Sequence, residues 1–197
     1  QIGQNAQNAL LACDLAENGL PGLNGVLEGR FGYFGLFEAA GDIRSVLPTL
    51  KQNWRIKEVA HKPFPSGRAT HGIVDAIREI QAEHEIDVDA VVLLEARVPS
   101  LINHLVGRPV HDNMEISYAR LNGQYAAAVM LQRKFIGIHD YTDEAIRNKA
   151  SIGLAEKVKI IVNDNPDPNA LSPVEIDIHM KNGEKFSRRI ETVYGNP

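Results

Sequence analysis

The apolar positions of the first 50 residues recur with the period of a helix. In residues 4–18 they form one stripe, which Asn18-Gly19 ends. Residues 31–39 predict one or two helical turns, and Asp42 is expected to cap a further short helix. These segments contain few apolar partners for one another. We therefore expect them to pack on additional chain, and the sequence to be a fragment of a longer protein.

From residue 54 the pattern changes to alternation with period two. Residues 54–59 predict a strand, residues 68–83 an amphipathic helix, and residues 88–96 a strand that is apolar on both faces and therefore central. An alanine-rich helix is expected next, over about 115–132, and a shorter one over 148–156.

Three strands are predicted to close the chain, over 157–163, 174–181 and 185–193. The last two flank Asn182-Gly183, a dipeptide that strongly signals a two-residue hairpin. We expect the three strands to form a β-meander. Helices collected on one side of a small mixed or antiparallel sheet make this an α+β domain.

Composition excludes several classes of protein. The 197 residues carry a net charge of −4 with acids and bases interspersed, which gives no nucleic-acid footprint. With no run of 18 apolar residues and no basic-then-apolar leader, we expect no membrane span and a cytoplasmic protein. Cys13 is the single cysteine, which excludes internal disulfides, thiolate zinc sites and a protein-held iron–sulfur cluster. It lies on the first apolar stripe and is expected to be buried.

The most distinctive stretch is residues 61–71, His-Lys-Pro-Phe-Pro-Ser-Gly-Arg-Ala-Thr-His. Its two prolines stiffen the backbone between an expected strand and an expected helix. Ser66 is placed to cap that helix. Lys62 and Arg68 close to a helix N-terminus predict an anion site. The alternative is a solvated basic turn that only reverses the chain.

Three blocks of sequence follow one another in a recognisable order. They are Ala-Glu-Asn-Gly-Leu-Pro-Gly and Val-Leu-Glu-Gly-Arg-Phe-Gly-Tyr-Phe within 9–41, Lys-Pro-Phe-Pro with Thr-His within 62–71, and Ala-Arg with Gln-Tyr-Ala-Ala-Ala within 119–128, followed by Lys-Val-Lys at 157–159. In this order the chain resembles the MmgE/PrpD family, whose members include 2-methylcitrate dehydratase and cis-aconitate decarboxylase.

The resemblance implies a two-domain subunit with the active site between the domains. Residues 1–52 would be the tail of a helical domain, and residues 53–197 most of an α+β lid. It further implies a small polycarboxylate as substrate, chemistry without metal or cofactor, and a homodimeric parent protein.

The resemblance also assigns roles to individual residues. Lys62 matches the family's lid lysine and would bind a carboxylate and stabilise charge. His71 matches a recurrent histidine and would be an acid or base, unless it only satisfies packing partners. Tyr125 matches a tyrosine whose phenol would donate to a carboxylate or to the leaving hydroxyl; otherwise it is a half-buried helix residue. Ser66 and Arg68 complete the predicted site as substrate-binding residues.

Other positions are interpreted differently. Gly67 stands where some relatives have a histidine or cysteine, which favours a substrate other than that of the decarboxylase. Arg120 is expected to pair with a glutamate and to serve structure. His111 and His139, each followed by aspartate, are interpreted as solvated loop residues rather than metal ligands.

Three hypotheses for function follow. The first is a lyase that dehydrates a small 2-hydroxy polycarboxylate, with general acid–base groups contributing roughly 10²–10⁴-fold each and fixed cations holding the carboxylates. The second is an isomerase that epimerises an amino-dicarboxylate. The third is a non-catalytic association module that uses the exposed apolar surface of residues 1–52. We expect the 197 residues alone to be catalytically inert.

Overall fold

The computed structural model describes residues 1–38 and 43–197 and divides the chain into two compact units, Gln1–Lys57 and Glu58–Pro197. The boundary thus falls a few residues after the predicted one between residues 52 and 53. Asp42, the predicted helix cap, lies outside the described residues. In the part of the chain that is described, no helix combines the length and apolar character of a membrane span.

The described residues of the first unit form helical segments without a buried hydrophobic side chain. Its helix α1 (Ile2–Glu17) has no buried residue, and Cys13 on that helix is exposed, so the expected burial of this cysteine is wrong. Aromatic side chains are also uncovered, with Phe31 77% exposed. The remaining elements are α2 (Tyr33–Phe37), α3 (Ile43–Val46) and the 3₁₀ helix η1 (Leu47–Thr49).

The predicted strand over residues 54–59 is wrong. Arg55–Glu58 form a 3₁₀ helix, η2, and the Lys57 amide donates to the Trp54 carbonyl at 3.2 Å. Trp54 and Ile56 are both exposed. Alternation alone does not make a strand, because a strand also needs a neighbour for its backbone hydrogen bonds, and this segment is not one of the four paired strands.

The second unit is built on a four-stranded sheet with the order β2-β1-β3-β4. Its strands are β1 (Val91–Val98), β2 (Val158–Val162), β3 (Val174–Met180) and β4 (Lys185–Ile190). The predicted central strand is confirmed as β1, which pairs parallel with β2 and antiparallel with β3. Gly183 adopts φ +86° in the confirmed hairpin between β3 and β4.

The predicted meander is only partly correct. β2 lies beside β1 and not beside β3, so only the last two strands are consecutive neighbours. A parallel pair needs a long crossover. The helices between β1 and β2 provide it: α5 (Ser100–Val106), α6 (Ile116–Ala119), α7 (Gly123–Arg133) and α8 (Lys149–Ala155), with the 3₁₀ turns η5 (Ile138–Tyr141) and η6 (Ala145–Arg147).

The predicted alanine-rich helix is broken into α6 and α7. Asn122 stands at the break, and its side-chain oxygen accepts a hydrogen bond from the Tyr125 amide at 2.8 Å, which caps α7. The predicted helix over 68–83 likewise has two parts, the 3₁₀ turn η3 (Arg68–Thr70) and α4 (His71–Glu83). One further 3₁₀ turn, η4 (Val88–Ala90), precedes β1.

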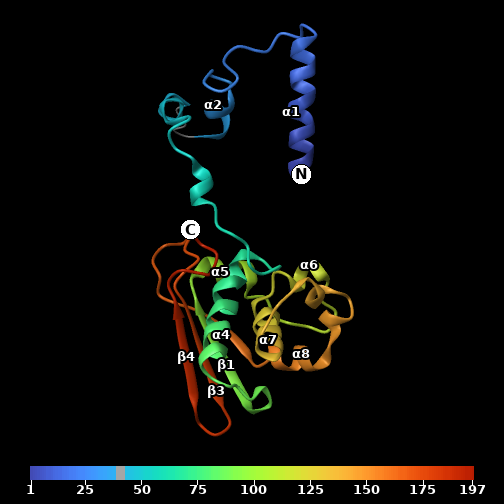
Figure 1. Ribbon diagram of the computed structural model, residues 1–197, viewed down its shortest axis with the longest axis vertical. Helices are drawn as coiled ribbons and strands as arrows, with labels where there is room; N and C mark the ends of the chain where they lie inside the picture. Colours follow the sequence, from blue (N-terminus) through green and yellow to red (C-terminus); the bar gives the residue numbers. More distant parts are fainter. Residues whose placement is uncertain (39–42) are drawn as a thin grey trace. The chain divides into compact units, whose positions relative to one another are not determined.

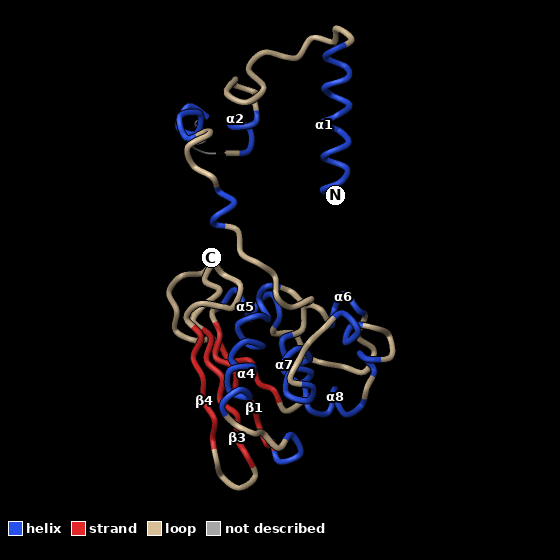
Figure 2. Tube along the Cα trace, viewed as in Figure 1, coloured by secondary structure: helices blue, strands red, loops and turns tan. Residues whose placement is uncertain are grey.

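The helices lie on one face of the sheet, which confirms the α+β class (Figures 1 and 2). Helix α4 packs on β3 and β4, and α7 packs on α4, α8 and β2. Leu94, Ala96 and Ile178 are buried beneath these helices. The opposite face is polar, and there Asp177 accepts hydrogen bonds from Arg97 and Ser187. One face of the sheet is therefore packed against helices, and the other faces solvent.

Candidate functional site

The distinctive stretch at residues 61–71 forms a corner that is attached to two distant segments. The His61 amide donates to the Gly195 carbonyl at 2.7 Å, and the Gly67 amide donates to the Arg120 carbonyl at 2.7 Å. A Cβ added to Gly67 would lie 2.5 Å from Leu121 Cδ2. Glycine therefore permits the close approach of the corner to the turn between α6 and α7.

Ser66 does not cap the helix, and this prediction is wrong. Its hydroxyl lies 2.6 Å from that of Thr70, whose own proton is donated to the Gly67 carbonyl at 2.9 Å. Gly67 occupies the N-cap position of η3. The 3₁₀ turn places Ser66 too early to reach the first amides of α4. Its side chain is 2% exposed and therefore lies inside the domain.

His71 is enclosed at the start of α4. It has no exposed surface, its Nε2 lies 3.4 Å from the Ser66 carbonyl oxygen, and its ring meets Phe64 edge-on at 5.3 Å. Burial lowers its pKa to about 4; the hydrogen bond to the Ser66 carbonyl opposes this, and the positive charges of Arg68 and Lys62 act in the same direction as burial. The imidazole is therefore neutral at neutral pH.

Tyr125 is enclosed in the first turn of α7. It is 1% exposed, and its hydroxyl donates to the Asp140 carbonyl at 2.7 Å. The ring of Tyr141 lies 5.9 Å away. Burial, followed by the charge of Asp140, raises the pKa of Tyr125 to about 12. The phenol therefore stays protonated and connects α7 to η5.

Lys62 lines a cavity of about 530 Å³, here called the lysine hollow. His139 is its other basic group, and the wall is largely apolar and includes Phe135, Ile138 and residues 63–65 of the corner. His71 and Tyr125 are not among its lining residues. Of the three predicted catalytic residues, only Lys62 therefore lines this cavity.

Arg68 lines a different cavity of about 310 Å³, here called the arginine hollow. Gly67, His104 and Arg108 also line it, together with leucine side chains such as Leu121. The Arg68 guanidinium donates to the side-chain oxygen of Asn196. Lys62 and Arg68 thus line two different hollows, which share no lining residue.

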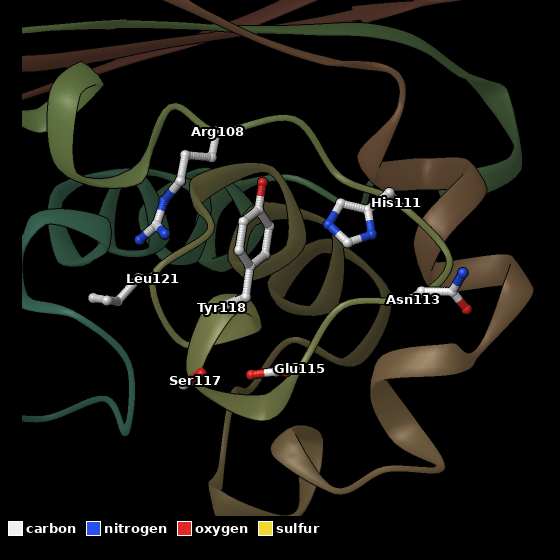
Figure 3. Close-up of a pocket in the computed structure, with 7 residues that line it drawn as sticks. All are labelled: Arg108, His111, Asn113, Glu115, Ser117, Tyr118 and Leu121. Atoms are coloured by element: carbon white, nitrogen blue, oxygen red, sulfur yellow. The ribbon is translucent and has the colours of Figure 1, made fainter.

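A third cavity of about 360 Å³ adjoins the arginine hollow, because Arg108 and Leu121 line both. Figure 3 shows Tyr118 at its centre, with Arg108 on one side and His111 on the other. The Arg108 Cζ lies 4.8 Å from the centroid of the Tyr118 ring, and the His111 ring lies 5.0 Å from it. A guanidinium on a tyrosine face is a favourable cation–π contact.

Three arginines near the corner have no carboxylate partner. Within the described residues of the second unit, every other arginine contacts a carboxylate oxygen within 4 Å: Arg78, Arg97, Arg133, Arg147, Arg188 and Arg189. The exceptions are Arg68, Arg108 and Arg120. Arg120 instead lies over the Tyr141 ring, 5.8 Å from its centroid, so the predicted pairing with a glutamate is wrong.

Glu95, Asp177 and His179 form a group on the open face of the sheet whose ligand atoms lie within 4.8 Å of one another. Asp177 already contacts Lys185 at 3.0 Å and accepts hydrogen bonds from Arg97 and Ser187. Burial alone would raise the pKa of Asp177, but these donors outweigh it and lower the pKa to about 2. The carboxylate is thus neutralised by protein cations, which is a poor arrangement for a metal ligand.

Sequence reasoning missed two residues of these hollows. His139, interpreted from the sequence as a solvated loop residue, is exposed and also lines the lysine hollow, and Arg108 is not among the residues predicted for the site. One signal for Arg108 exists in the sequence, because the neighbours Gly107 and Pro109 bracket it in a loop with restricted geometry.

Comparison with known proteins relates most of the chain to one family. Residues 64–197 match the MmgE/PrpD C-terminal domain. Over 99% of the chain, the sequence is 30% identical to cis-aconitate decarboxylase of Mus musculus and 29% identical to that of Homo sapiens. The chain spans 41% of the length of each of these relatives.

Proposed function

Because the chain belongs to the MmgE/PrpD family, we propose that it is the lid part of a lyase that acts on a small polycarboxylate, such as 2-methylcitrate. The observation that carries the proposal is the set of cations around the corner. Arg68 and Arg108 have no carboxylate partner within the described residues and line one cavity, while Lys62 lines another. Guanidinium and ammonium groups that are not neutralised by the protein are suited to holding substrate carboxylates.

Lys62 is the candidate catalytic group. Loss of water from a 2-hydroxy acid breaks a C–H bond beside a carboxylate, gives the proton to a base, and releases the hydroxyl as water after protonation. Negative charge develops on the carboxylate next to the carbon that loses its proton. An ammonium held at that carboxylate stabilises the charge, and stabilisation of this kind is often the largest contribution to catalysis.

His71 and Tyr125 have different proposed roles. Each is enclosed, and neither lines the lysine hollow. We assign them to positioning: His71 supports the corner through the Ser66 carbonyl, and Tyr125 fixes η5, which carries His139 into the lysine hollow. His139, which lines the same cavity as Lys62, is then the candidate general acid or base.

Decarboxylation is the second candidate, and the names of the two relatives favour it. In that reaction the bond between carbon and the carboxylate breaks, the electron pair stays on the carbon, and a proton is added there. A cation that stabilises the resulting carbanion could serve either reaction. Gly67 remains the position at which we expect the substrate to differ from that of the decarboxylase.

The test uses the polypeptide that contains this chain, incubated with 2-methylcitrate and with cis-aconitate. Formation of a carbon–carbon double bond reports dehydration, and release of carbon dioxide reports decarboxylation. We expect Lys62→Ala to lower kcat by at least tenfold, since it removes an interaction that strengthens in the transition state. Lys181→Ala, in the β3–β4 turn and exposed, is the matched control. Turnover by Lys62→Ala equal to that of the control would remove Lys62 from the mechanism.

A further inference from the structure

We propose that Arg108 and Arg68 together bind one carboxylate group of an aliphatic polycarboxylate in the arginine hollow, and that Tyr118 positions Arg108 for this purpose. This inference rests on the proposed function for the identity of the ligand class. It assigns a binding residue, Arg108, that is not among the residues predicted from the sequence, and it concerns a cavity that Lys62 does not line.

Arg108 is held in place by its main chain. The side-chain amide of Asn122, which has no exposed surface, donates to the Arg108 carbonyl at 2.8 Å. Pro109 restricts the backbone of Arg108, the residue that precedes it. Gly107 packs so closely on Asn103 that an added Cβ would lie 2.3 Å from the Asn103 side-chain oxygen. The position of Arg108 is therefore determined by α7 and α5 on both sides.

The side chain of Arg108 is oriented by Tyr118. The Tyr118 hydroxyl donates to the Pro109 carbonyl at 2.7 Å, which fixes the ring. The guanidinium lies on one side of this ring and His111 on the other (Figure 3). Its single hydrogen bond within the described residues is to the Leu105 carbonyl, at 3.3 Å. Stacking leaves most of the five N–H donors of the guanidinium available to a ligand.

The lining of the hollow selects the kind of anion. Arg68 and Arg108 both line the hollow with planar guanidinium groups, and the Arg68 group also donates to the side-chain oxygen of Asn196. Guanidinium N–H donors are well suited to carboxylate oxygens. The remaining wall is largely hydrocarbon and comes from Leu101, Leu105 and Leu171. A strongly hydrated inorganic anion gains nothing from these leucines, whereas the methylene groups of an aliphatic acid do. A short-chain polycarboxylate therefore fits both parts of the cavity.

The experiment measures binding of tricarballylate (propane-1,2,3-tricarboxylate) to the 197-residue chain by calorimetry. This probe lacks a hydroxyl and a double bond, so binding is independent of turnover. We expect Arg108→Ala and Arg68→Ala each to weaken binding by about tenfold or more, as for the loss of a charged hydrogen bond. If both arginines hold one carboxylate, the double variant will lose less than the product of the single effects. Arg147→Ala, an exposed arginine paired with Asp143, is the control.

Further variants separate positioning from folding. Arg108→Lys keeps the charge without the planar donor group and should bind between wild type and Arg108→Ala. Tyr118→Leu keeps Arg108 but removes the ring, and should weaken binding if the ring positions Arg108. Thermal unfolding checks that each variant is folded, and inorganic sulfate in place of the probe should bind at least tenfold more weakly.

Several results would overturn the inference. They are absence of tricarballylate binding by the wild-type chain, equal binding by Arg108→Ala and the Arg147→Ala control, and independent effects of the two arginines in the double variant. None of these results decides the lyase proposal. That proposal is tested by turnover of the polypeptide that contains this chain and by the Lys62→Ala variant.

Discussion

The Nε2 atom of His71 lies 3.4 Å from the carbonyl oxygen of Ser66, five residues earlier in the chain. This contact folds the corner back on the first turn of α4. The buried ring packs against Phe64, and the positive charges of Arg68 and Lys62 act on it. The corner is therefore built around a neutral imidazole, and protonation of this ring opposes folding.

Stability should consequently fall between pH 6.5 and pH 4. The pKa of His71 is about 4 in the folded chain and 6.5 for the unperturbed group, so the unfolded chain binds more protons in this interval. The contribution is complete above pH 6.5 and decreases as the pH falls toward 4, by about 3 kcal/mol in total. Urea unfolding at a series of pH values measures it. In His71→Phe, which retains an aromatic ring, this part of the pH dependence should disappear; an unchanged slope would show that other groups cause it.

Removal of the Tyr125 hydroxyl should destabilise the domain. Tyr125→Phe keeps the ring but leaves the buried Asp140 carbonyl without its donor at 2.7 Å. We expect a loss of about 1–3 kcal/mol in the free energy of unfolding. Tyr118→Phe, whose hydroxyl also donates to a carbonyl but at a more exposed site, should lose less. Equal losses in the two variants would contradict the importance that we give to burial.

Two glycines of the corner region should respond differently to alanine. In Gly67→Ala the new Cβ would meet Leu121 Cδ2, the end of a partly exposed side chain that can turn away. The expected change is within about 1 kcal/mol. In Gly72→Ala the new Cβ would lie 2.7 Å from Val174 Cγ2 and 3.2 Å from its Cβ, in the core. Overpacking there should cost about 1–3 kcal/mol. Chemical denaturation of both variants provides the comparison, and a reversed order would be inconsistent with the packing described.

The contribution of Asp177, on the open face of the sheet, to the free energy of unfolding should be lost in acid. The pKa of Asp177 is about 2 in the folded chain against 3.8 for the unperturbed group. This group stabilises the fold fully above about pH 4, and the effect is lost as the pH falls toward 2, by about 2 kcal/mol. Asp177→Asn should flatten the acid limb of the stability profile. Asp143→Asn, at an exposed ion pair, serves as the reference and should leave that limb unchanged.

Much of the second unit could be predicted from local pattern. The hairpin at Asn182-Gly183, the central strand and the helix over 71–83 follow from turn chemistry and from hydrophobic periodicity. The neighbour of β2 could not be predicted, because alternation fixes the faces of a strand but not the edge that it joins. The error over residues 54–59 has the same origin, since pattern says nothing about whether a partner strand is available.

The site was predictable only in part. The sequence identified the corner, Lys62 and Arg68, and both of these cations line cavities. It did not indicate which residues line these cavities: His71 and Tyr125 are buried and line neither the lysine hollow nor the arginine hollow. Arg108 was missed because the absence of a carboxylate near a guanidinium is a property of distances in three dimensions, which composition and spacing do not contain.

The strand order has a consequence for the rate at which the chain folds. Leu94 pairs with Val158 on one side and with Ile178 on the other, so both neighbours of β1 arrive from far along the polypeptide. The β3–β4 hairpin needs only a short turn and can form within microseconds, whereas closing β1 against β2 must wait until the whole crossover has collapsed. The slow step in refolding should therefore be the docking of β1 and β2, with the hairpin already present as a template.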